Sequence, residues 1–199
     1  LNIAGIGVRK WGMGAGNLSQ CETENIVALC DVDQKQAAPT YKKYPKAKVY
    51  KDFRLMLENQ KDIDAVIVAT PDHNHAVITM LAMKMGKHVY CQKPLTHTVY
   101  EARMITEAAK KYKVQTQMGN QGRSSDEIRS LKEWIDDDAI GKVREVFAWT
   151  DRPVGGHEWD TFAVKAMSKD KPPIPEGLDW DLWLGPAPYR DYHPDYHPL

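Results

Sequence analysis

The sequence predicts an α/β protein with a doubly wound parallel sheet, followed by the start of a second α/β domain whose sheet is mostly antiparallel. Over residues 1–123, apolar strand-like runs alternate with helix-like runs, which is the order of consecutive βαβ units. The run at residues 65–70 is apolar almost throughout, as expected of a strand covered on both faces of a parallel sheet. Beyond residues 152–153 the composition shifts. We expect one domain over residues 1–123 and the beginning of another over residues 124–199.

The residue pattern also bounds the elements of the first domain. Five strands are expected at residues 1–7, 25–31, 65–70, 89–93 and 114–118, and a short further one at Val49 and Tyr50. The helices between them are expected near residues 17–21, 34–38, 53–57, 76–83 and 100–112. Because parallel strands joined by right-handed crossovers end at one edge, Gly7, Asp31, Thr70, Lys93 and Asn120 should meet there.

The second domain is expected to begin with an amphipathic helix at residues 126–137 and an alternating strand at residues 143–150. Prolines then interrupt any long element up to the last residue. His193 and His197 are four apart, but Pro194 between them argues against a helical zinc pair.

Charge and composition indicate neither a nucleic-acid partner nor a membrane partner. Lys and Arg together number 27, as do Asp and Glu, so the net charge is zero. No apolar run approaches the roughly 18 residues that span a bilayer. Cys21, Cys30 and Cys91 are isolated, so we expect buried free thiols rather than a disulfide framework or a zinc site.

The two ends of the sequence suggest an excerpt of a longer polypeptide. Residue 1 is Leu rather than Met and already lies in a strand-like run, and residues 196–199 close with no helix or strand. The compartment stays open between the cytoplasm and, if a leader peptide was removed upstream of Leu1, the periplasm.

A glycine-rich loop follows the first strand and precedes a helix. Gly5, Gly7 and Gly12 are candidates to let the backbone approach a dinucleotide pyrophosphate. The fit to G-x-G-x-x-G is imperfect, since the third position counted from Gly5 is Lys10. Residues 8–11 resemble a small insertion in the loop.

Asp31 ends the second strand, 24 residues after Gly7. An acid about 20 residues after the glycine loop accepts hydrogen bonds from the adenosine ribose and repels a 2′-phosphate, which favours NAD over NADP. In the alternative interpretation, Asp31 and Asp33 are caps of the helix that begins at Gln34.

Lys93 stands where a buried strand is stopped by Pro94, which cannot donate to a strand ladder. Ligands of open α/β sheets bind at this end of the strands. A partly desolvated lysine there can exchange protons near neutral pH. The alternative is a surface lysine before a turn.

His73 and His75 follow the apolar strand that ends at Thr70 and Pro71. No cluster of carboxylates or cysteines accompanies these histidines, so we expect loop or capping roles and no metal site.

Four groups of residues resemble the Gfo/Idh/MocA oxidoreductases, named for glucose–fructose oxidoreductase, inositol dehydrogenase and a rhizopine-catabolism protein. They are Ala69-Thr70-Pro71 with His75, Gln92-Lys93-Pro94, Gly119-Asn120-Gln121, and the tryptophan-rich segment 179–186. The resemblance implies an N-terminal Rossmann domain and a C-terminal α/β domain built on a large open sheet.

The resemblance also implies roles for matching residues. Lys93 would contact substrate and nicotinamide and move the hydroxyl proton, and Pro94 would fix its backbone. Asp31 would bind the adenosine ribose. Thr70, Pro71, His75 and Gln92 would belong to the cofactor cleft, with Asn120 near the nicotinamide. The family usually has Glu where this chain has Gln92, which removes a negative charge beside Lys93. A histidine partner from the second domain is expected beyond Leu199.

The implied function is that of a bacterial enzyme of carbohydrate metabolism, an NAD(P)-dependent oxidoreductase. It would transfer hydride between NAD, or less readily NADP, and a CH–OH group of a sugar, cyclitol or related polyol. One alternative is a glycosidase that uses tightly bound NAD by transient oxidation and elimination. Another is a non-enzymatic NAD-binding protein. A homo-oligomer, dimer or tetramer, is expected.

Overall fold

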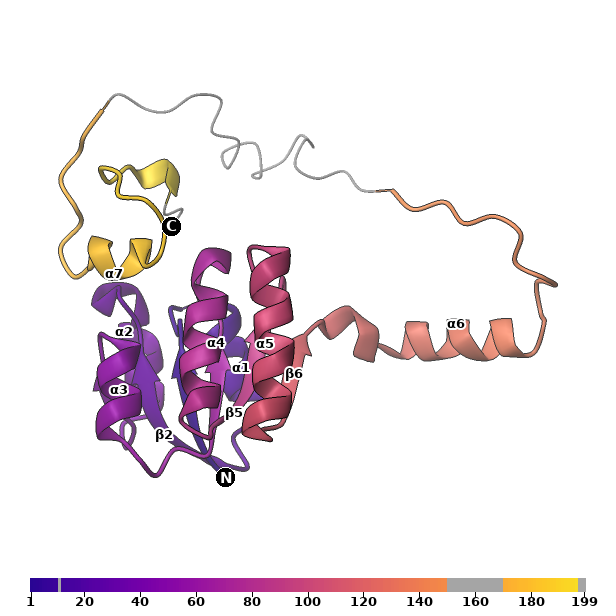
Figure 1. Cartoon of the computed structure of the whole chain (residues 1–199), viewed down its shortest axis with the longest axis horizontal. Helices are drawn as coiled ribbons and strands as arrows, with labels where there is room; N and C mark the ends of the chain where they lie inside the picture. The colour runs from indigo at the N-terminus through magenta and orange to yellow at the C-terminus, as the bar shows by residue number, and fades with distance from the viewer. Residues whose placement is uncertain (11, 150–169, 197–199) are drawn as a thin grey trace. The chain divides into compact units, whose positions relative to one another are not determined.

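The structure is a computed structural model that describes residues 1–10, 12–149 and 170–196 (Figure 1). The chain divides into two compact units. One consists of Leu1–Gly119 and Pro175–Tyr189, and the other of Asn120–Ile174 and Arg190–Leu199. The sequence pattern places Pro175–Tyr189 in the second domain, whereas the structure packs this segment with the first.

The first unit contains a six-stranded sheet in the order β3-β2-β1-β4-β5-β6, with every neighbouring pair parallel. Its strands are β1 Asn2–Ile6, β2 Asn25–Cys30, β3 Lys48–Tyr50, β4 Ala65–Val68, β5 His88–Gln92 and β6 Thr116–Gly119. This confirms the predicted doubly wound parallel sheet, including the short strand at Val49 and Tyr50. The strand order reverses between β1 and β4, where open α/β sheets bind their ligands.

Helices cover both faces of this sheet, as Figure 1 shows. They are α1 Met13–Ser19, α2 Gln34–Lys43, α3 Phe53–Asn59, α4 His75–Lys84 and α5 Val99–Tyr112. One buried cluster joins Ala4 and Ile6 of β1 to α3, α4 and α5, and the other joins Ile3 of β1 to Leu18 and Ala37 of α1 and α2. Alternate residues of β1 therefore enter opposite cores, as the two-residue repeat of a strand requires.

Side-chain caps fix where several helices begin. Thr98 and Glu101 form a capping box at the start of α5. Helix α1 begins at Met13, four residues before the expected start, although it contains two glycines. A Cβ at Gly14 would run into the carbonyl oxygen of Gly7, so close packing rather than helix propensity decides this residue.

The cysteines are free, as expected, and Cys30 and Cys91 are buried. Burial raises the pKa of the Cys91 thiol to about 11, so this thiol stays protonated at neutral pH. None of the helices in the described residues has the length and apolar character needed to cross a membrane.

The second unit differs from its prediction. Helix α6, Asp126–Asp136, is present, but residues 143–149 form no strand, and Thr150 and His197 lie outside the described residues. Val146, Phe147 and Trp149 are exposed. The alternating pattern of residues 143–149 suits a strand with one buried face. A strand also needs a hydrogen-bonded neighbour, and the described part of this unit contains no other strand. The predicted antiparallel sheet is therefore absent from the described residues.

Candidate cofactor-binding and active site

The carboxyl ends of the central strands lie level at one edge of the sheet. Ile6 is in register with both Cys30 and Val68, and Val68 is in register with Cys91. The residues that follow β1, β2, β4 and β5 therefore emerge side by side, as the sequence predicts for Gly7, Asp31, Thr70 and Lys93.

Glycine is required at two places where the loop after β1 meets its neighbours. Gly7 has a φ of +80°, and a Cβ on it would lie 2.5 Å from the carbonyl oxygen of Ala69. Its backbone N–H donates to the carbonyl of Cys30 at 2.9 Å. Gly14 packs directly on Gly7, as noted above. The two glycines thus let the loop, helix α1 and the end of β4 pack closely, as in the glycine turn of a dinucleotide-binding fold.

The inserted residues of the loop are anchored to the β2–α2 region. The backbone N–H of Val8 donates to Oδ2 of Asp31 at 2.7 Å, and that of Lys10 donates to the carbonyl of Gln36 at 2.9 Å. Gly12 N–H donates back to the carbonyl of Arg9 at 3.0 Å, immediately before α1. The insertion therefore closes as a turn against α2.

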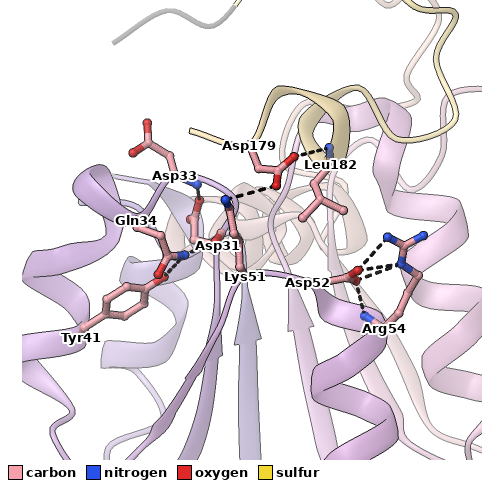
Figure 2. Close-up of polar contacts among 9 residues, drawn as sticks. All are labelled: Asp31, Asp33, Gln34, Tyr41, Lys51, Asp52, Arg54, Asp179 and Leu182. Carbon is pink, nitrogen blue, oxygen red and sulfur yellow. Dashed lines mark hydrogen bonds and ion pairs between the residues drawn. The ribbon is translucent and has the colours of Figure 1, made fainter. Parts of the chain in front are cut away.

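Asp31 is 8% exposed, and backbone N–H groups bind both of its carboxyl oxygens. Figure 2 shows the bond from Asp33. Oδ1 accepts from Asp33 N–H at 2.9 Å, opposite the bond from Val8. Burial raises the pKa of Asp31 to about 6, although the N–H groups that donate to it oppose the rise. The helix cap is Asp33, whose Oδ1 accepts from the first turn of α2. Asp31 instead holds the glycine loop, and its ribose role stays a prediction.

The elevated pKa of Asp31 gives a testable dependence of stability on pH. Because about 6 exceeds the ordinary value of 3.8, the stability tied to this carboxyl is present below about pH 4 and lost as pH rises through 6. We expect the free energy of unfolding of Asp31→Asn, relative to wild type, to improve by at most roughly 3 kcal/mol from pH 4 to pH 7. Urea unfolding across this range measures it. Parallel pH profiles for the two proteins would contradict the assignment, and Asp137→Asn on an exposed residue controls for lost charge.

Within the described residues, two buried polar atoms near this edge have no hydrogen-bond partner. They are Oε1 of Gln92, at the end of β5, and Oγ1 of Thr70, after β4. Gln92 is 4% exposed, and its Nε2 donates to Oδ1 of Asn17 at 2.5 Å. Buried polar atoms are nearly always bonded to protein, water or ligand. These two are therefore candidates for ligand contacts.

Lys93 is exposed, and Pro94, joined to it by a cis peptide bond, follows it at the same edge. The carbonyl of Pro94 lies 2.7 Å from Nδ1 of His75, and Nε2 of the same ring lies 2.8 Å from the carbonyl of Thr70. His75 is 1% exposed. Since both partners are acceptors, the ring donates, with one N–H when neutral and two when protonated. His75 thereby ties the segment after β5 to the segment after β4.

Most of the sequence-predicted site residues belong to the first unit. They are Gly5, Gly7, Gly12, Asp31, Thr70, Pro71, His75, Gln92, Lys93 and Pro94. Asn120 belongs to the second unit, so its nicotinamide role stays a prediction. Among the described residues, no group of His, Cys, Asp and Glu is arranged to hold a metal ion.

Sequence reasoning missed two features. Asn17 contacts Gln92, and the only available signal was its position one helical turn after Gly14. Segment Pro175–Tyr189 contacts the residues after β2 and β4, and no local pattern predicts these contacts. Its helix α7, Trp180–Leu184, places the carbonyl of Trp183 2.9 Å from Nδ2 of Asn74.

Known proteins resemble this chain over part of their length. Inositol 2-dehydrogenase of Salmonella typhimurium is 33% identical over 119 residues, which cover 59% of this chain and 35% of that protein. D-glucoside 3-dehydrogenase of Escherichia coli is 29% identical over 153 residues, covering 77% of this chain and 43% of that protein. The chain thus spans less than half the length of either relative.

Solved structures share the fold. Myo-inositol 2-dehydrogenase from Lactobacillus plantarum superposes with a TM-score of 0.65 at 26% identity, covering 72% of this chain and 43% of that one. A probable dehydrogenase from Thermotoga maritima gives 0.63 at 28% identity, with 71% and 42% covered.

Family matches cover nearly all of the chain. Residues 1–120 match the oxidoreductase family with an NAD-binding Rossmann fold, and residues 124–197 match the C-terminal alpha/beta domain of the same family. The chain therefore belongs to the Gfo/Idh/MocA oxidoreductase family.

Proposed function

We propose that the chain binds NAD along the carboxyl edge of its sheet. The whole protein would transfer hydride between NAD and a CH–OH group of a sugar, cyclitol or related polyol. The observation that carries this proposal is the pair of unpartnered buried atoms, Oε1 of Gln92 and Oγ1 of Thr70, at the strand ends beside Lys93. An amide oxygen and a hydroxyl at this position suit the carboxamide and hydroxyl groups of a nicotinamide riboside.

The described residues fit the two halves of the cofactor. Gly7 and Gly14 let the loop after β1 pack closely against α1 and the residues after β4, since no Cβ fits at either, and such close-packed glycines support a dinucleotide-binding turn. Asp31 keeps lone pairs for the ribose hydroxyls of the adenosine half, and its ionised form opposes a 2′-phosphate. Both features support NAD more than NADP. The names of the relatives, which act on inositol and glucosides, support a polyol or sugar substrate.

In the proposed reaction Lys93 handles the proton. NAD, when bound, accepts the hydride that leaves the carbinol carbon. The Nζ atom of Lys93 accepts the hydroxyl proton as the carbonyl forms. His75 positions Lys93 through the carbonyl of Pro94, and Gln92 bonds without adding a negative charge beside the amine.

The second domain would complete the enzyme. We propose that residues 143–149 become a strand of an antiparallel sheet in the whole protein, which would cover the exposed Val146, Phe147 and Trp149. That domain would supply a catalytic histidine and an interface for a dimer or tetramer. Light scattering on the whole protein measures the assembly.

Titration of the whole protein with NAD and NADP, followed by turnover assays with inositols and glucosides, tests the proposed function. We expect tighter binding of NAD than of NADP, and NADH accumulating with at least one polyol. Failure to bind either dinucleotide would refute the proposal. Release of an aglycone without net NADH would instead support the glycosidase.

A further inference from the structure

Segment Pro175–Tyr189, here called the strap, pairs with the backbone directly after β2. Leu178 and Asp33 form an antiparallel bridge. Gln34 N–H donates to the carbonyl of Gly177 at 3.0 Å, and Asp179 N–H donates to the carbonyl of Val32 at 2.9 Å. Residues 177–179 of the strap therefore run antiparallel to residues 32–34, which come directly after Asp31.

The other end of the strap is fastened after β4. The carbonyl of Trp183 accepts from Nδ2 of Asn74 and lies 2.9 Å from Nε2 of His73. The ring of His73 also rests against that of Trp183, with centroids 5.2 Å apart. A Cβ on Gly185 would run into Oδ1 of Asn74, so the strap leaves α7 in close contact with this loop.

Burial, more than surface charge, holds the strap in place. Leu178, Trp180 and Leu184 are each at most 7% exposed. Asp179 adds an ion pair with Lys51 at 3.2 Å and caps α7 through the N–H of Leu182 (Figure 2). Exposed ion pairs such as that of Lys35 and Glu176 add little.

The two fastening points flank the start of the glycine loop. In the sheet order, β2 and β4 are the two neighbours of β1, and the loop begins where β1 ends. In a doubly wound sheet the adenosine half of a dinucleotide lies over this first βαβ unit, next to the acid after β2. A segment joined to the loops after both neighbours therefore borders that half-site.

We propose that the strap forms the outer wall of the adenosine half of the cofactor site and slows the release of NAD. The inference rests on the proposed binding of NAD. It assigns to the strap, which the family match places in the C-terminal domain, a positioning role in the first unit.

Two matched glycine variants of the whole protein test the strap. Gly185→Ala introduces a methyl against Asn74, whereas Gly86→Ala introduces one into open space at a similarly positive φ of +74°. We expect Gly185→Ala to raise the NADH dissociation rate about tenfold and to weaken ADP-ribose binding equally, with nicotinamide mononucleotide affinity unchanged. Gly86→Ala should alter none of these. Rapid-mixing fluorescence and calorimetry measure them.

An unchanged NADH dissociation rate in Gly185→Ala, or an equal loss of mononucleotide affinity, would overturn the strap assignment while leaving NAD binding intact. Absence of NAD binding to the wild type would refute the proposed function and the strap role together. Should Gly185→Ala not fold, Asp179→Asn keeps an acceptor for the α7 cap and removes the ion pair with Lys51. It should raise the dissociation rate by a smaller factor, and a wild-type rate would count against the strap.

Discussion

Replacing Lys93 with methionine is expected to lower turnover of the whole protein by about two to four orders of magnitude. The amine is proposed to accept the proton of the substrate hydroxyl, and methionine keeps an unbranched chain of similar length. Because Lys93 is exposed, the fold should survive the change. Steady-state kinetics, with kcat and KM measured separately, follow the effect.

The control for Lys93 is Lys110→Met, which removes an exposed lysine on α5. It should leave kcat unchanged. In Lys93→Ala, added primary amines should restore part of the lost rate, because a small amine can enter the space and take the proton. Full turnover in Lys93→Met would exclude the catalytic assignment, and lost turnover together with lost thermal stability would indicate a structural role instead.

Gly14→Ala should both destabilise the protein and abolish NAD binding. The added methyl meets the backbone oxygen of Gly7, which cannot move without displacing the loop from Ala69. Overpacking of this kind costs about 1–3 kcal/mol, and the displaced loop would no longer cradle a pyrophosphate. Thermal or urea unfolding and NAD titration measure the two effects.

The same helix provides a control of opposite sign. A Cβ at Gly16 would meet nothing within 4 Å. Gly16→Ala should therefore stabilise α1 by about 0.5–1 kcal/mol, because alanine favours a helix over glycine, and should leave NAD binding as it is. Equal effects of the two variants would show that helix propensity, not the contact with Gly7, decides this segment.

The edge that carries the site could be predicted because it depends on local signals. Apolar runs that end in Gly7, Asp31, Thr70 and Lys93 define strand ends, and parallel connections bring such ends together. The start of α1 could not be predicted in the same way. Glycine disfavours helices, and only a long-range contact between Gly14 and Gly7 explains why the helix begins so early.

The strand predicted at residues 143–150 is not formed within the described residues. Residues 143–150 alternate as a strand should, but alternation describes a surface and does not supply a neighbour to pair with.

The unpartnered oxygen of Gln92 could not be predicted either, since the presence of a glutamine in the sequence does not say which of its atoms form hydrogen bonds. The strap joins residues far apart, as with Lys35 and Glu176, which are 141 positions apart. Contacts between residues this far apart produce no repeating pattern in the sequence from which they could be predicted.

The return of the strap makes the nucleotide-binding half a discontinuous domain. Its chain leaves at Gly119, runs through the residues of the other unit, and re-enters at Pro175. A fragment that ends at the family boundary near residue 123 would lack the buried Leu178, Trp180 and Leu184. The apolar surface that these side chains cover would then be exposed to solvent. A faithful minimal fragment would instead join residues 1–119 to 175–189 through an artificial linker long enough to cross from β6 to β2, which stand four places apart in the sheet.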